Sequence, residues 1–89
     1  MFEFEIIIVN NKGMHARASA KFVETVEAFD AKCEVTKDGI TVSGDSIMGL
    51  LMLAASKGSS IALKTWGDES RLLADALIKL IADNFEEEH

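Results

Sequence analysis

The sequence is short of the residues that build disulfides, metal sites and rigid turns: it has no proline, one cysteine and two histidines in 89 residues. Cys33 has no cysteine partner for an internal disulfide, which is typical of a reducing cytoplasm, and we expect it to be a small buried hydrophobe. Because His15 and His89 are the only histidines, no metal site is expected. His89 is expected to be unstructured, and is either native or an added residue.

Basic residues are also scarce, with 9 Lys and Arg against 15 Asp and Glu and a formal net charge of -6. This balance argues against a nucleic-acid backbone or an anionic membrane as the main partner. No apolar run approaches the roughly 20 residues that span a bilayer, and the acidic N-terminus does not resemble a signal peptide. The hydrophobic fraction of 48% is typical of a globular chain, so one domain over residues 1–89 is expected.

Hydrophobic periodicity predicts seven elements in the order βαββαβα. The predicted strands are residues 2–9, 32–37, 40–43 and 60–66, and the predicted helices are residues 16–28, 47–54 and 69–85. An Asp38-Gly39 hairpin turn lies between the second and third strands. This order favours an α+β open-faced β-sandwich, in which a four-stranded antiparallel sheet carries three helices on one face.

The pattern also predicts which of several further side chains are buried or cap a helix. Ile7 and Val9 interrupt the polar face of the first strand, so its far end is expected to be covered on both sides. Ile40 is expected to face the core, and Asp68 to cap the last helix. Residues 86–88 are expected to form a frayed acidic end.

The most informative stretch places His15 directly before a predicted helix and Arg17 two residues later. Helix-start amides and the helix dipole form an anion site and disfavour imidazolium, so we expect a neutral ring able to attack phosphorus. The amides near Ala16 and Arg17 are expected to hold phosphoryl oxygens, with the Arg17 guanidinium pairing with them. Gly13 permits the turn into this arrangement. From position alone, an exposed histidine without a task remains the alternative.

The short helix predicted at residues 47–54 has more apolar residues than one core-facing stripe needs. We expect Leu50 and Leu53 to pack in the core. Ile47, Met48 and Leu51 are then left for an exposed patch that docks a partner, with packing on all sides as the alternative.

Two segments carry a resemblance to a known family. Residues 13–17, Gly-Met-His-Ala-Arg, resemble the phosphorylation-site signature of the HPr family, the histidine phosphocarriers of the phosphoenolpyruvate-dependent phosphotransferase system. Residues 44–51 resemble the family's regulatory-serine region, at the family's separation, and the length also matches. The resemblance implies the same open-faced sandwich. It also implies a phosphocarrier rather than an enzyme, which needs no cofactor.

The resemblance further implies partners and sites. Phosphorylated enzyme I is expected to pass a phosphoryl group to Nδ1 of His15, and an enzyme IIA-type domain to receive it. Ser46 matches the serine that HPr kinase/phosphorylase modifies in part of the family, although a helix N-cap explains it equally. A monomer is expected, with a small transient interface centred on Met14, Ile47, Met48 and Leu51.

The chain departs from the commonest family pattern at Ala18, where most members have proline. A first helical turn accepts either residue. Residues 18–22, Ala-Ser-Ala-Lys-Phe, resemble a subgroup that includes nitrogen-related and alphaproteobacterial carriers. Glu24 and Glu27 stand where sugar-system members of enteric type bear more lysine, so sugar uptake and purely regulatory phosphorelay both remain open.

Two other function classes remain open at this point. One is a regulatory binder with an HPr-like fold that acts through docking and Ser46 modification; the presence of His15 argues against it. The other is a ferredoxin-like nucleic-acid binder, against which the acidic balance counts.

Overall fold

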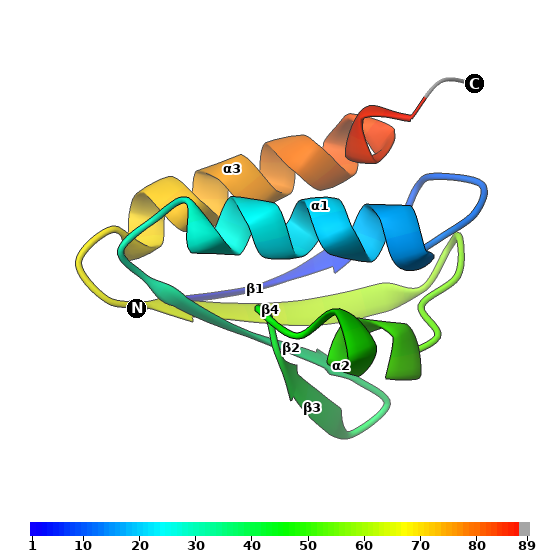
Figure 1. Ribbon diagram of the computed structural model, residues 1–89. Coiled ribbons are helices and arrows are strands. Elements are labelled where there is room, and N and C mark those ends of the chain that lie inside the picture. Colours follow the sequence, from blue (N-terminus) through cyan, green and yellow to red (C-terminus); the bar gives the residue numbers. More distant parts are fainter. Residues whose placement is uncertain (88–89) are drawn as a thin grey trace.

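Four antiparallel strands form one sheet in the order β1-β4-β2-β3 in the computed structural model, which describes residues 1–87 (Figure 1). The strands are β1 (Phe2–Ile7), β2 (Lys32–Lys37), β3 (Ile40–Ser43) and β4 (Ser60–Trp66). The helices are α1 (Ala16–Glu27), α2 (Ile47–Met52) and α3 (Ser70–Ala82), followed by a short turn η1 (Asn84–Glu86). The predicted βαββαβα order and α+β open-faced sandwich are confirmed. The expectations for residues 88 and 89 lie outside the described residues.

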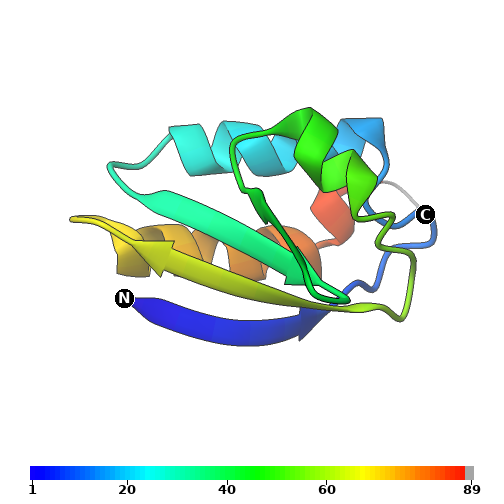
Figure 2. The ribbon, with the colours of Figure 1, turned by 90° about the horizontal axis from the view of Figure 1, so that it is seen from below.

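The helices lie on one face of the sheet, and Figure 2, which is seen from below, shows α3 passing behind the strands. Alternation in β4 directs Ile61, Leu63 and Thr65 into the core, where all three are buried. The helical spacing of Ala18, Phe22 and Val26 buries one stripe of α1 against them. This packing fixes α1, and with it the residue that precedes α1, relative to the sheet.

Four residues differ from their predicted environments or roles. Ile7 is exposed because within residues 1–87 the sheet is covered on one face only, and Val9, beyond the end of β1, is also exposed. Ile40 shares the covered face with Val42, but it is exposed because it begins the edge strand β3. Asp68 does not cap α3: the N-cap is Glu69, whose side chain instead accepts a hydrogen bond from the Asp30 amide at 2.7 Å.

No helix within residues 1–87 combines the length and the apolar character that a bilayer crossing needs. In the same part of the chain, no group of three or more His, Cys, Asp or Glu side chains is placed to hold a metal ion.

Candidate functional site: a histidine at the start of α1

The loop before α1 is anchored on both sides of Gly13. Gly13 has φ +64°, and a Cβ there would overlap the Ala55 carbonyl group. The Met14 amide donates to the same Ala55 carbonyl oxygen at 2.8 Å, and Asn10 Nδ2 donates to the Gly13 carbonyl oxygen at 2.8 Å. Glycine is therefore required both for the left-handed backbone and for the close approach. These contacts set the direction in which the chain enters α1.

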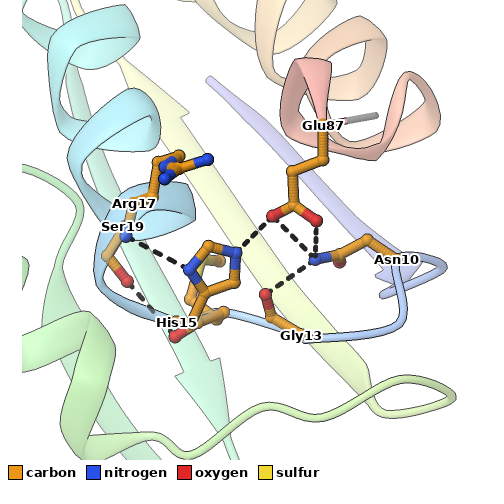
Figure 3. A network of polar contacts seen from close by, with 7 residues as sticks. Asn10, Gly13, His15, Arg17, Ser19 and Glu87 are labelled. Carbon is orange, nitrogen blue, oxygen red and sulfur yellow. Dashed lines mark hydrogen bonds and ion pairs between the residues drawn. The ribbon is translucent and has the colours of Figure 1, made fainter. Parts of the chain in front are cut away.

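His15 is the N-cap of α1, and its ring is held by the helix start (Figure 3). Its carbonyl oxygen accepts from the Ser19 amide at 2.8 Å, and its Nδ1 accepts from the Arg17 amide at 3.2 Å. Because an amide can only donate, Nδ1 carries a lone pair and the proton of the neutral ring is on Nε2. The side chain is 27% exposed, so the ring is accessible to a partner.

The other ring nitrogen, Nε2, forms a hydrogen bond with the Glu87 carboxylate. Asn10 Nδ2 also reaches the two carboxylate oxygens, at 3.3 and 3.4 Å. Partial burial raises the pKa of Glu87, but the hydrogen bonds from His15 and Asn10, with the positive charge of Lys12, outweigh it and hold that pKa below its ordinary value of 4.5. Glu87 is therefore an ionised acceptor at neutral pH.

The ring opens onto a polar pocket of about 350 Å³. It is lined by Lys12, His15, Arg17, Lys21, Glu86 and Glu87. The Arg17 side chain projects from the first turn of α1 (Figure 3), and Lys21 lies one turn further along. Three cationic side chains beside one imidazole suit a phosphoryl group, which carries close to two negative charges.

The structure brings His15 and Arg17 together as expected, but it corrects Met14. Met14 is 4% exposed and belongs to the core, so it supports the loop from below and cannot form the centre of a docking surface. The Arg17 amide, expected to face an anion, donates to His15 Nδ1 in this state.

Asn10 and Glu87 were missed from sequence. Asn10 is 77 positions away from Glu87, and no local pattern pairs the two residues. Glu87 was assigned to a frayed end, whereas its side chain is largely buried against His15. One feature of the sequence does point to an ordered segment here. Phe85 is apolar, and by packing in the core it can anchor the residues that follow α3.

A second region lies on α2, which runs beside the N-terminal half of α1 in both ribbon views. Ser46 is the N-cap of α2, and its Oγ accepts from the Gly49 amide at 3.0 Å, so the N-cap interpretation is confirmed. Leu50 and Leu53 are buried as expected.

The outer side of α2 is apolar, with Met48 71% exposed. We call Ile47, Met48, Leu51 and Met52 the α2 patch; all four are exposed. The exposure expected for Ile47, Met48 and Leu51 is confirmed, and Met52 extends the patch. Unlike Met14, these side chains are free to meet another surface.

Comparison with known proteins assigns this arrangement to a family. The profile of the PTS HPr component phosphorylation site matches residues 2–83. The chain is 46% identical over 87 residues to phosphocarrier protein HPr of Neisseria meningitidis, covering 98% of each chain. It is 40% identical to that of Cupriavidus necator, again covering 98% of each. The crystal structure of HPr-C-His from Thermoanaerobacter tengcongensis is similar over 100% of both chains, with a TM-score of 0.94 and 39% identity.

Proposed function

The chain belongs to the HPr family, the phosphocarriers of the phosphotransferase system, and we propose that His15 is the residue on which it carries the phosphoryl group. As a family member it is a phosphocarrier and not a catalytic enzyme. The observation that supports His15 most strongly is the hydrogen bond from the Arg17 amide to Nδ1, because it requires that nitrogen to be unprotonated. The ring also lies beside a pocket in which three cationic side chains outnumber two carboxylates.

We propose phosphorylated enzyme I as the donor. Nδ1 of His15 attacks phosphorus while the bond to the donor breaks and the donor keeps its electron pair. For this attack the Arg17 amide releases Nδ1, whose in-plane lone pair becomes the bond to phosphorus, and the amide donates to a phosphoryl oxygen instead. The Arg17 guanidinium and the amides at Ala16 and Arg17 stabilise the transferred charge. Because these donors already lie at the helix start, transfer needs only a local change in which the Arg17 amide exchanges its acceptor.

The proposed acceptor is an enzyme IIA-type domain, which docks on the α2 patch and the exposed side of His15. Exposed methionines suit a surface that meets two different partners, since their side chains adapt to each. The interface is small and transient, because the carrier must be released after each transfer. The working unit in this proposal is a monomeric domain over residues 1–89, in the cytoplasm.

Ser46 offers a second, regulatory function under the same proposal. Phosphate added by an HPr kinase/phosphorylase would lie at the start of α2, where helix amides tolerate negative charge. It would also lie next to Ile47 and Met48, so it would weaken docking on the α2 patch without unfolding the domain.

The experiment uses enzyme I and phosphoenolpyruvate labelled in its phosphoryl group. We expect an acid-labile, base-stable label on the wild-type chain and on Ser46→Ala, and none on His15→Ala. A label that persists in His15→Ala would contradict the assignment. Label obtained only from ATP and a kinase, and lost in Ser46→Ala, would favour the purely regulatory alternative.

A further inference from the structure

The segment that carries Glu87 has a strained backbone. Asn84, Phe85 and Glu86 have φ values of 54°, 55° and 62°, so three consecutive residues that are not glycine adopt the left-handed conformation. This conformation is unfavourable for Phe85 and Glu86, whose Cβ crowds the following carbonyl oxygen, and is better tolerated by Asn84. Strain of this kind persists only where the surroundings over-determine the conformation, and it concentrates at functional sites.

Several contacts hold the strained turn in place. Phe85 is completely buried in the core and anchors the segment. The amides of Glu86 and Glu87 donate to the carbonyl oxygens of Asp83 at 2.9 Å and Asn84 at 3.0 Å. Lys21 of α1 pairs with Glu86 at 3.3 Å. The chain therefore turns back toward α1 instead of continuing along the axis of α3.

The turn delivers one carboxylate to the active ring (Figure 3). Glu87 accepts from His15 Nε2 and from Asn10 Nδ2, while the same Asn10 nitrogen also donates to the Gly13 carbonyl oxygen. The ring is thus held at both nitrogens, by the helix start at Nδ1 and by the C-terminal segment at Nε2.

We propose that Glu87 is a positioning residue for phosphoryl transfer: its carboxylate holds the ring proton on Nε2, which keeps the lone pair on Nδ1 available to phosphorus. This inference rests on the proposed function of His15. A histidine's hydrogen-bond partner at one nitrogen determines which nitrogen carries the proton, and therefore which one is nucleophilic.

The carboxylate also matters for the product of the transfer. When the bond from Nδ1 to phosphorus forms and the bond from phosphorus to the donor breaks, the proton stays on Nε2, so the step needs no proton acceptor. The ring gains positive character, which the Glu87 carboxylate offsets. Glu87 therefore favours the neutral attacking ring by fixing its tautomer, and the charged product ring by pairing with it.

The surroundings of Glu87 define a matched control. Lys12, Arg17 and Lys21 are the cationic side chains of the pocket, and Glu86 pairs with Lys21 rather than with His15. Glu86→Ala removes the same charge from the same segment without touching the ring. It should leave the tautomer populations of His15 unchanged.

The test combines ¹⁵N NMR of the His15 ring with the rate of labelling by enzyme I. In the wild type we expect the tautomer with the proton on Nε2 to dominate among neutral His15 rings. Glu87→Ala should mix the two tautomers and slow labelling by about tenfold, the lower end of the loss known for partners that orient metal-ligating histidines. Glu87→Gln retains an acceptor for Nε2–H, so it should restore the tautomer and recover part of the rate.

A Glu87→Ala protein with wild-type tautomer populations and a wild-type labelling rate between pH 6 and 9 would overturn the inference. That result is distinguishable from failure of the proposed function, in which the wild type takes no label or His15→Ala keeps it. Circular dichroism of each variant shows whether the fold is retained, and the tautomer signal reports on the ring independently of any change in stability.

Discussion

The Arg17 amide donates to His15 Nδ1 at 3.2 Å, across the first turn of α1. One helix-start donor thus orients the ring before transfer and lies next to the atom where phosphorus will bind. The same piece of backbone can bind an anion and, together with Glu87 at Nε2, favours Nδ1 as the nucleophilic nitrogen. The expected outcomes below depend on the elements that hold this geometry.

Gly13→Ala should destabilise the protein more than a glycine replacement at an open turn. Gly13 has φ +64°, and the new Cβ would also lie 2.8 Å from Ser56 Cα. Gly39, at φ +81°, has nothing within 4 Å of the added Cβ, so Gly39→Ala is the matched control for strain alone. We expect about 1 kcal/mol for Gly39→Ala and about 3 kcal/mol for Gly13→Ala in urea unfolding. Equal losses would contradict the close approach at Ala55.

Ser46→Ala should lower the free energy of unfolding by about 1 kcal/mol, because Ser46 Oγ caps α2 through the Gly49 amide. Ser46→Asp retains an acceptor at the cap and should be close to wild type in stability. If added charge weakens docking on the α2 patch, Ser46→Asp should bind enzyme I less tightly than Ser46→Ala does, by isothermal titration. Tighter binding by Ser46→Asp would argue against regulation through this residue.

Met48→Ala should weaken binding to enzyme I without lowering the stability of the fold. Met48 is exposed on the α2 patch, so its loss should change the free energy of unfolding by less than about 0.5 kcal/mol while weakening enzyme I binding. Leu50, two positions along the same helix, is fully buried, and Leu50→Ala should cost about 2–5 kcal/mol. Leu72→Ala, at an exposed apolar position on α3, is the control for a surface change outside the patch. Equal weakening of binding by Leu72→Ala would contradict the patch assignment.

Glu87 should contribute to the free energy of unfolding at neutral pH and lose that contribution in acid. Hydrogen bonds from His15 and Asn10 outweigh burial and lower its pKa below the ordinary 4.5, so between the folded and unfolded values the unfolded chain binds more protons. The contribution of Glu87 is therefore present above about pH 4.5 and is lost as the pH falls through its lower folded pKa. Urea unfolding of the wild type and Glu87→Ala should show a difference at pH 6 that shrinks toward pH 2. A difference that grows on acidification would contradict this sign.

Cys33 should be an unreactive thiol in the folded protein. Burial, followed by the negative charges of Glu34 and Asp45, raises its pKa to about 12, so almost no thiolate is present at pH 8. We expect slow alkylation by iodoacetamide in buffer and rapid alkylation in concentrated urea. Comparable rates in the two solvents would show that the thiol is accessible.

Local patterns predicted the elements of the fold because each depends on neighbours in sequence. The alternation of Ile61, Leu63 and Thr65 and the helical spacing of Ala18, Phe22 and Val26 determine which faces are buried. The Asp38-Gly39 turn follows from the preference for positive φ at both positions, which the structure has at 51° and 81°. The exposure of Ile7 and Val9 was missed because periodicity cannot show that one face of the sheet is left uncovered.

In the candidate site too, contacts between residues close in sequence were predicted and contacts between distant residues were not. His15 and Arg17 lie two residues apart, so a helix start was enough to predict their proximity. Glu87 reaches His15 across 72 positions and only through a left-handed turn at Asn84, Phe85 and Glu86, of which Asn84 alone favours that conformation. Met14 was misplaced because an apolar residue next to a functional one has the same sequence signal whether it docks a partner or packs beneath the loop.

The most direct measurement is ³¹P and ¹⁵N NMR of the protein after phosphorylation by enzyme I and phosphoenolpyruvate. We predict a single phosphorus signal coupled to Nδ1 of His15, with Nε2 still protonated and the Arg17 amide proton shifted by its new phosphoryl acceptor. Phosphorus on Nε2, or on any residue other than His15, would contradict the central claim.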